Sequence, residues 1–208
     1  RRKGRFPAVP GVDDDLVGVV LDRFVEPTLA ALRNLGIDYR GVLYAGLMLT
    51  PEGPKLVEYN VRFGDPEAEV VLPRYAGDLA ALLAEAASGR IESTPSFVDD
   101  AAVTVVAAAE GYPRSPRTGD PIRGLEAASA VPGVTVFGAG VALDDMGRVV
   151  TAGGRVLAVT ALAPRLAEAR IRAYEAIDLV YWDGRFSRRD IAASAAALDE
   201  PSEVTGGA

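Results

Sequence analysis

The sequence predicts a mixed α/β (α+β) protein built from two successive parts. Two apolar runs flank the turn residues 50–54, which predicts an antiparallel hairpin in the first part. Short strand-like runs follow one another in the second part, which predicts a small β-rich domain. Residues 91–100 are polar and lack periodicity, so we place the boundary there, between parts 1–92 and 101–198. The small, polar residues 199–208 are expected to form a disordered tail.

The composition limits the classes of function. Hydrophobic residues make up 49% of the 208 residues and charged residues 25%, as in ordinary soluble globular proteins. A net charge of −7 argues against a general nucleic-acid binder, which usually carries a basic face. No apolar run approaches the roughly 20 residues that cross a bilayer, so we expect no membrane partner. The chain starts at Arg1 without a signal-peptide pattern, and we expect an incomplete chain of a cytoplasmic protein.

The absence of two residue types restricts the chemistry. The chain contains no cysteine and no histidine, which excludes disulfides, thiolate metal sites and the commonest general base. Chemistry must therefore depend on carboxylates, lysine, arginine, hydroxyls, backbone amides and a hard cation. Phosphoryl transfer fits this restriction, because it depends mainly on positioning and on stabilising charge.

Two helices are predicted in the first part from their end signals. Asp13 is expected to cap a helix that is kinked at Pro27 and ends at Gly36. Asp78 is expected to cap a second helix that ends at Gly89. Residues 41–49 and 55–61 are the expected hairpin strands. In the second part we expect strands at 102–108, 134–141, 148–151 and 155–160, and a helix at 164–176.

The strand at 55–61 offers a candidate metal site. Successive side chains of a strand point to opposite faces, so Glu58, Asn60 and Arg62 should share one face. Carboxylate and amide oxygens are hard ligands suited to Mg²⁺, and the arginine would hold a phosphate. The opposite face should carry Val57, Tyr59 and Val61.

The turn that follows this strand has two interpretations. Asp65 and Glu67 would lie at the end of a sheet, where sites tend to lie. Alternatively, Asp65 caps the next helix, with Pro66 in its first turn and Glu67 as a favourable charge. Local physics favours neither interpretation.

Two weaker patterns occur in the second part. The Ala-Gly-Gly-Arg run at 152–155 would turn backbone amides toward a phosphate, but a hairpin turn is the commoner explanation. Arg185, Arg188, Arg189 and Asp190 are expected to form surface or interdomain ion pairs rather than a catalytic group.

Several motifs together resemble the phosphoribosylamine–glycine ligase family, also called glycinamide ribonucleotide synthetases. The Arg-Phe-Gly-Asp-Pro-Glu run at 62–67 is highly specific to that family. The resemblance covers roughly residues 12–192. Its motifs lie at 39–49, 58–67, 111–113, 119–125, 151–157 and 188–191.

The resemblance implies an ATP-grasp fold and a ligase activity. Residues 1–92 would be the carboxy-terminal part of an ATP-grasp domain with an antiparallel sheet, and 101–198 the family's small carboxy-terminal domain. The family ligates glycine to 5-phosphoribosylamine through a glycyl phosphate, giving glycinamide ribonucleotide, ADP and phosphate in de novo purine (IMP) biosynthesis. ATP is the co-substrate, and Mg²⁺ or Mn²⁺ is the cofactor.

The resemblance also implies roles for individual residues. Glu58 and Asn60 would bind the metal ion and thereby the nucleotide. Arg62 would stabilise the transferring phosphoryl group and Asp65 would help to bind the amino substrate, so both are catalytic candidates. The substrate-binding candidates are Asp65, Pro66, Glu67, Gly154 and Arg155.

Two departures from the family pattern shape the expectation. The family chain is about twice as long, so we expect a missing amino-terminal half and no activity from these residues alone. Glu69 stands where family members usually have glutamine. The alternatives are another ATP-grasp carboxylate–amine ligase, or a non-catalytic remnant.

Overall fold

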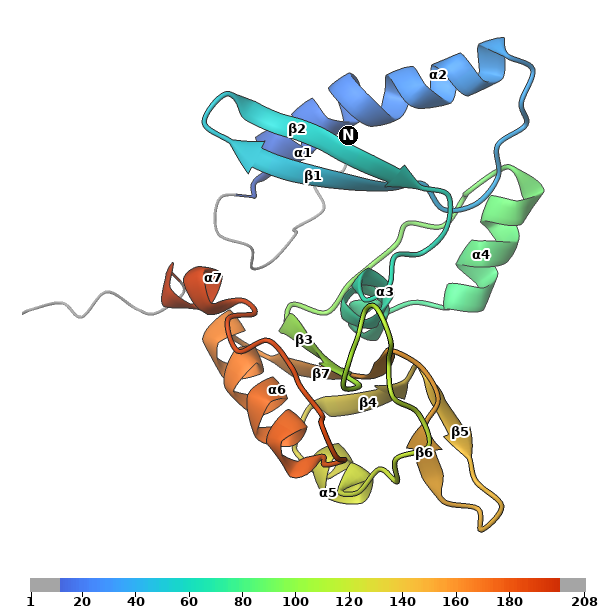
Figure 1. Cartoon of the computed structure of the whole chain (residues 1–208). Helices are drawn as coiled ribbons and strands as arrows, with labels where there is room; N and C mark the ends of the chain where they lie inside the picture. Colours follow the sequence, from blue (N-terminus) through green and yellow to red (C-terminus); the bar gives the residue numbers. More distant parts are fainter. Residues whose placement is uncertain (1–11, 199–208) are drawn as a thin grey trace, which may run out of the picture. The chain divides into compact units, whose positions relative to one another are not determined.

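The computed structural model describes residues 12–198, which divide into two compact units (Figure 1). Unit 1 comprises the described residues up to Ala68 together with Tyr75–Val98. Unit 2 comprises Glu69–Arg74 and the described residues from Asp99 onward. None of the helices in the described part of the chain is long and apolar enough to span a membrane.

Unit 1 begins with a continuous helical segment. Asp13 caps helix α1 (Asp14–Val20), its carboxylate accepting a hydrogen bond of 2.8 Å from the amide of Leu16. A π-helical stretch (Leu21–Val25) leads into α2 (Glu26–Asn34). The predicted irregularity at Pro27 is therefore the wider turn just before it, since proline has no amide to donate to the preceding turn.

Glycine ends this segment as predicted. Gly36 has a φ of +73°, and its amide donates to the carbonyl of Arg33. The amide of Ile37 donates to the carbonyl of Leu32, which completes a Schellman motif.

The predicted hairpin is present. Strands β1 (Tyr44–Thr50) and β2 (Gly53–Asn60) pair antiparallel, with Gly46 opposite Glu58 and Leu47 opposite Leu56. Val57 is thus the extra residue of a β-bulge.

The remaining elements of unit 1 follow the turn after β2. Helix α3 (Glu67–Val71) continues into a 3₁₀ turn (Leu72–Arg74). Helix α4 (Leu79–Ser88) begins after Asp78, whose carboxylate caps it, and ends at Gly89 with a φ of +86°. Both ends were predicted from the sequence.

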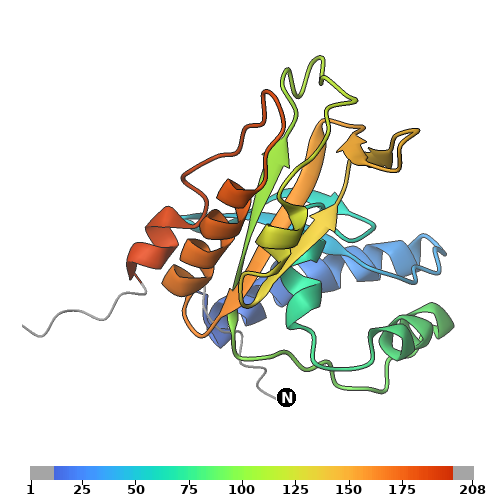
Figure 2. The same ribbon diagram turned by 90° about the horizontal axis from the view of Figure 1, so that it is seen from below.

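Unit 2 is built on a three-stranded antiparallel sheet. The strand order is β3 (Ala101–Ala108), β7 (Arg155–Ala163), β4 (Val134–Gly138). Helices α5 (Leu125–Ser129) and α6 (Leu166–Leu179) lie together against one face of this sheet (Figure 2). A small hairpin of β5 (Val141–Leu143) and β6 (Val149–Thr151), and helix α7 (Ala193–Leu198), complete the unit.

The central strand β7 forms the core of unit 2. Its residues from Val156 to Ala161 are all buried, because both faces of the strand are covered. The hydroxyl of Thr160 lies 2.7 Å from that of Thr104 and donates to the carbonyl of Glu69 at 2.9 Å. This contact helps to tie the segment Glu69–Arg74 to unit 2.

Several details of unit 2 differ from the prediction. The expected strand 134–141 is divided into β4 and β5 at Gly140, which packs so closely on Gly153 that an added Cβ would lie 2.7 Å from the Cα of Gly153. Strand β7 extends to Ala163, beyond the predicted end at 160, and α6 ends at Leu179 rather than 176. The short helices α5 and α7 were not predicted, because five or six residues carry little periodicity.

Unit 1 has no comparable core. Among its described residues only Pro54 and Gly64 are buried, whereas all other buried residues in the range 12–198 belong to unit 2. The apolar residues of unit 1 thus lack a covering layer within the part of the chain that the structure describes.

Candidate functional site

One face of the β1–β2 hairpin gathers the predicted metal ligands. Tyr44 is paired with Asn60 and Gly46 with Glu58, so these four residues share a face of the hairpin. A Cβ on Gly46 would lie 3.2 Å from the Cγ of Glu58. The glycine therefore leaves room for the glutamate above β1.

Glu58 and Asn60 lie side by side, as predicted. The amide nitrogen Nδ2 of Asn60 donates a hydrogen bond of 2.9 Å to Oε1 of Glu58. This arrangement leaves Oε2 of the glutamate and Oδ1 of the asparagine as hard oxygen donors on one face. Within residues 12–198 no group of three acidic, histidine or cysteine residues could hold a metal ion. The pair fits Mg²⁺, which commonly takes one or two protein ligands and completes its shell with water and phosphate oxygens.

Tyr44 connects this face to the following turn. Its hydroxyl lies in the field of the carboxylates of Glu67 and Glu58. Burial, followed by these two carboxylates, raises the pKa of Tyr44, because both effects disfavour the phenolate. Tyr44 remains a neutral donor at pH 7.

The side chain of Glu67 packs against the turn after β2. Gly64 is buried, and a Cβ on it would lie 2.1 Å from Oε2 of Glu67. The amide of Ala68 donates to the carbonyl of Gly64 at 3.0 Å. The glycine thus allows the carboxylate of Glu67 to fold back over the turn, next to Tyr44. Asp65 is exposed and joined to Pro66 by a cis peptide bond, and its role stays a prediction.

Arg62 lies outside the strand. The predicted strand extends to Val61, but β2 ends at Asn60, so strand alternation does not place Arg62 beside Glu58. Its guanidinium is exposed, and Nη1 donates to the carbonyl of Phe63 at 2.7 Å.

The opposite face of the hairpin packs on helix α2 and differs from the prediction. The hydroxyl of Tyr59 donates to the carbonyl of Phe24 and lies 2.8 Å from the hydroxyl of Thr28. Leu56, rather than Val57, accompanies Tyr59 on this side, and Val57 is 66% exposed. The bulge at Val57 causes the difference, because one extra residue shifts the alternation.

The glycine run at 152–155 is a close-packed crossing rather than a hairpin turn. Strand β6 pairs with β5 whereas β7 pairs with β3 and β4, so the hairpin interpretation is wrong for the described strands. The amide of Ala152 donates to the carbonyl of Gly140, and the amide of Gly140 donates to the carbonyl of Arg155. A Cβ on Gly154 would lie 2.3 Å from the ring of Tyr112. Gly154 and Arg155 thus have a fixed backbone at the start of β7.

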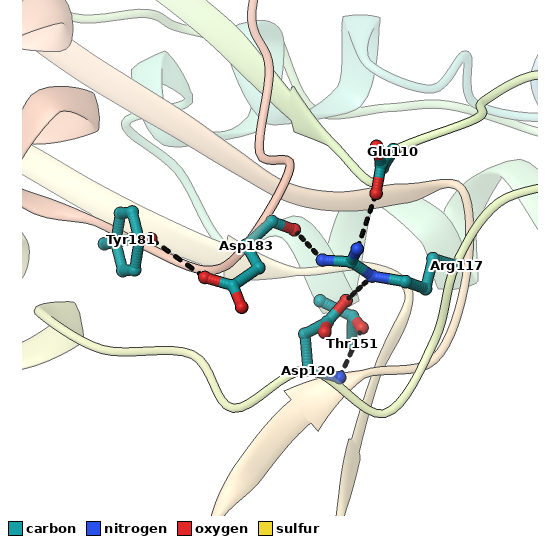
Figure 3. A network of polar contacts seen from close by, with 6 residues as sticks. All are labelled: Glu110, Arg117, Asp120, Thr151, Tyr181 and Asp183. Atoms are coloured by element: carbon teal, nitrogen blue, oxygen red, sulfur yellow. Dashed lines mark hydrogen bonds and ion pairs between the residues drawn. The ribbon is translucent and has the colours of Figure 1, made fainter.

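A polar network lies in unit 2 (Figure 3). The guanidinium of Arg117 contacts Asp120 at 2.8 Å, Glu110 and the carbonyl of Asp183. Asp120 and Asp183 also line a hollow of about 250 Å³. The network joins the loop after β3 to the segment that follows α6.

The arginines near the end of unit 2 form ion pairs, as predicted. Arg188 pairs with Asp190 at 2.6 Å, and Arg189 pairs with Asp178 at the same distance. The hydrogen bond from Arg189 lowers the pKa of Asp178. Both partners of each pair are largely exposed, so these pairs add little to stability.

The sequence reasoning missed Tyr44 as part of the candidate site. Its position opposite Asn60 depends on the hairpin register, which alternation along one strand does not reveal. The available signal was the tyrosine in the first hairpin strand, combined with a count back from the turn at 51–52.

Two protein-family models match the chain. The model described as phosphoribosylglycinamide synthetase, ATP-grasp (A) domain, matches residues 3–68. The model described as phosphoribosylglycinamide synthetase, C domain, matches residues 102–194.

Curated relatives match nearly all of the chain. A phosphoribosylamine–glycine ligase from Brucella melitensis is 44% identical over 189 residues, which cover 90% of this chain and 44% of that protein. The Streptomyces coelicolor enzyme of the same name is 46% identical over 197 residues, covering 93% and 47%. The chain thus spans about half the length of the curated relatives it matches.

Two solved structures are similar to the chain. A phosphoribosylamine–glycine ligase from Thermotoga maritima superposes with a TM-score of 0.72 at 36% identity, covering 88% of this chain and 45% of that one. An N5-carboxyaminoimidazole ribonucleotide synthetase from the same organism superposes with a TM-score of 0.57 at 16% identity, which shows a similar fold alone.

Proposed function

Because the chain belongs to the phosphoribosylamine–glycine ligase family, we propose that the whole protein ligates glycine to 5-phosphoribosylamine with ATP. The observation that carries this proposal is the pair of Glu58 and Asn60 on one hairpin face, directly followed by the Arg-Phe-Gly-Asp-Pro-Glu run. The reaction would serve de novo purine biosynthesis in the cytoplasm. The substrates are small molecules, and neither nucleic acid nor membrane takes part.

The proposed reaction has two bond-forming steps. A carboxylate oxygen of glycine attacks the γ-phosphorus of ATP, and the bond to the bridging oxygen breaks to release ADP. The amine of 5-phosphoribosylamine then attacks the carbonyl carbon of glycyl phosphate. Phosphate leaves with the electrons of the carbon–oxygen bond, and the amine loses a proton as glycinamide ribonucleotide forms. Neither step needs a protein nucleophile, which agrees with the absence of cysteine and histidine.

Glu58 and Asn60 would hold Mg²⁺ or Mn²⁺ in this reaction. When bound, the cation neutralises negative charge on the phosphates of ATP. Nδ2 of Asn60 lies 2.9 Å from Oε1 of Glu58, so the asparagine amide would turn over to present its oxygen beside the carboxylate. Gly46 keeps the space above β1 open for the glutamate.

The turn after β2 would hold the substrates. Arg62 would stabilise charge on the transferring phosphoryl group, which suits an exposed guanidinium that can reorient. The carboxylate of Asp65 would bind the amino substrate. Pro66 and Glu67 would shape the same pocket, with Tyr44 orienting the Glu67 carboxylate.

Gly154 and Arg155 would be further substrate-binding residues. The packing of Tyr112 over Gly154 and the bond from the Gly140 amide support a rigid backbone there. Rigid backbone close to a ligand suits a residue without a Cβ.

We further propose that these 208 residues are inactive without the remainder of the family chain. Residues 1–92 would be the carboxy-terminal part of an ATP-grasp domain, and 101–198 the small carboxy-terminal domain. The match of the two family models to 3–68 and 102–194 supports this division. Stoichiometric phosphate release by the purified chain with ATP, Mg²⁺, glycine and phosphoribosylamine would contradict the proposed inactivity.

The function is tested with a chimera that supplies the missing half. The portion of the Streptomyces coelicolor relative outside the match is joined to this chain, and phosphate release is measured with each substrate omitted in turn. We expect release only with both glycine and phosphoribosylamine, and a loss of at least about 100-fold in Glu58→Gln. Glu52→Gln, at the exposed hairpin turn, is the matched control. Release that needs bicarbonate instead of glycine would assign the chain to a different ligase.

A further inference from the structure

A loop of unit 2 is closed on itself through Arg117. The loop follows strand β3 and runs from Glu110 to Arg117. The backbone amide of Arg117 donates to the carbonyl of Glu110 at 2.9 Å, and the guanidinium donates to the carboxylate of the same residue. The guanidinium also donates to Asp120 at 2.8 Å and to the carbonyl of Asp183 (Figure 3). One side chain thus fixes the base of the loop to two neighbouring segments.

The interior of this loop is compact. The amides of Arg114 and Ser115 both donate to the carbonyl of Gly111, at 3.1 and 2.9 Å. The amide of Tyr112 donates to the carbonyl of Ala109 at 3.2 Å. A Cβ on Gly111 would lie 2.2 Å from the carbonyl oxygen of Ser115, so the turn needs the glycine, whose φ is +80°. The closed loop therefore determines where Tyr112 lies.

Tyr112 is the side chain through which the loop meets Gly154. Its ring lies 2.3 Å from the position that a Cβ on Gly154 would take. The amide of Ala109, which precedes the loop, donates to the carbonyl of Gly154 at 2.9 Å. An aromatic ring and a main-chain hydrogen bond thus hold Gly154, and Arg155 follows it directly in the chain.

The contacts of Arg117 suit a role in geometry more than one in stability. The side chains of Arg117 and Glu110 are 43% and 58% exposed, and ion pairs of such exposure add little to stability. A guanidinium donates several hydrogen bonds in fixed directions from one plane, which an ammonium group does not. The fork of Arg117 can therefore set the position of the loop.

We propose that Arg117 is a positioning residue, which acts through Tyr112 on the main chain of Gly154 and Arg155. Its role rests on the substrate-binding function proposed above for the latter two residues, and it adds the residue that sets their geometry. Arg117 itself contacts no reacting atom. A small displacement of a substrate-binding residue is enough to weaken the alignment of a substrate.

The experiment measures binding to the chimera described above, with glycine and ribose 5-phosphate as separate probes in NMR titrations. In Arg117→Gln we expect the affinity for one probe to fall at least about 10-fold and that for the other to change less than about twofold. The affected probe identifies the substrate that Gly154 and Arg155 contact. In steady-state assays the KM of the corresponding substrate should rise by the same factor, while kcat changes less than about threefold.

Arg117→Lys separates position from charge. It keeps the positive charge but loses the planar fork, so we expect the affinity to remain at least about fivefold reduced. Full recovery of affinity in this variant would show that the field of the charge matters rather than the position of the loop, and would overturn the proposal.

A double variant tests the path through Tyr112. Tyr112→Ala should weaken the same probe about as much as Arg117→Gln does. The combined variant should be less than about twofold weaker than Tyr112→Ala alone, because both changes displace the same contact. Losses that multiply would show that the two residues act independently and would overturn the proposal.

Arg165→Gln is the matched control. Arg165 pairs with Glu168 at 2.9 Å and its side chain is 47% exposed, but it follows the end of β7 opposite to Gly154. We expect its effect on either affinity to be less than about twofold. Far-UV circular dichroism verifies that each variant keeps its fold.

The two proposals fail separately in this design. Binding of both probes without phosphate release would contradict the proposed function alone. Release and binding that are unaffected by Arg117→Gln would contradict the positioning role alone. An unsubstituted chimera that binds neither probe would contradict both.

Discussion

The carboxylate of Glu67 acts on the hydroxyl of Tyr44 and raises its pKa, which couples strand β1 to the turn after β2. The two residues are far apart in sequence, and the hairpin register brings them together. Because Glu58 lies on the same face, the tyrosine lies within the field of two carboxylates. The hairpin and the turn therefore form one polar cluster rather than two separate motifs.

The first prediction concerns the titration of Tyr44. Glu67→Gln should lower the pKa of Tyr44, because it removes a negative charge that disfavours the phenolate. The tyrosinate absorbance of each protein is compared with that of its Tyr44→Phe counterpart, so that the difference reports Tyr44 alone. Glu52→Gln is the control and should leave the difference unchanged.

The raised pKa also predicts a pH dependence of stability. The ordinary pKa of the phenol is 10.0, and the folded state holds the proton more tightly than the unfolded state does. The stabilisation from Tyr44 is therefore complete below about pH 10 and is lost as the pH rises through the folded-state pKa. Unfolding in urea between pH 8 and 11 should show a smaller alkaline loss in Tyr44→Phe. An equal loss in both proteins would contradict the assignment.

The second prediction concerns Gly64. Gly64→Ala would place a Cβ 2.1 Å from Oε2 and 3.0 Å from Cβ of Glu67, so the glutamate must move away from Tyr44. We expect a loss of about 1–3 kcal/mol in the free energy of unfolding and a lower pKa of Tyr44. Gly18→Ala in helix α1 is the control, since nothing lies within 4 Å of its Cβ position. That change should be neutral or stabilise by up to about 1 kcal/mol.

Local signals predicted the ends of elements well. The helix caps at Asp13 and Asp78, and the ends at Gly36 and Gly89, depend on neighbouring backbone groups alone. The hairpin turn at 50–54 is equally local. Each could therefore be derived from a few residues.

Features that depend on pairing could not be predicted in this way. Because of the bulge at Val57, Leu56 rather than Val57 faces α2. The polar and apolar alternation along one strand does not reveal this bulge. The crossing of Gly140 over Gly153 separates β6 from β7, although the sequence suits a hairpin. The prediction that Glu58 and Asn60 share one face of the strand is confirmed, because both residues follow the bulge and strand alternation is regular from Glu58 to Asn60.

The third prediction concerns the core of unit 2. Ile177→Ala should lower the free energy of unfolding by about 2–5 kcal/mol, because Ile177 is 0% exposed and its removal leaves a cavity. Ile171→Ala, on the same helix α6, is the control because Ile171 is 63% exposed. Its effect should be within about 0.5 kcal/mol. Denaturant unfolding followed by fluorescence of the buried Trp182 measures both, and equal losses would contradict the packing.

The fourth prediction concerns Glu69, for which the family resemblance implies glutamine. Oε2 of Glu69 is buried and has no hydrogen-bond partner among residues 12–198. A buried carboxylate oxygen without a partner loses solvation that nothing replaces, and a neutral amide loses less. Glu69→Gln should therefore raise the free energy of unfolding of unit 2 at pH 7 by about 1 kcal/mol or more.

The comparison for Glu69 is Glu175→Gln, an exposed position on helix α6 where the same change should be close to neutral. Thermal unfolding at pH 7 measures both variants. Because the backbone carbonyl of Glu69 accepts from Thr160 at 2.9 Å, the main-chain contact persists in either variant and the difference reports the side chain alone. A loss of stability in Glu69→Gln would show that the carboxylate has a favourable partner and would contradict this prediction.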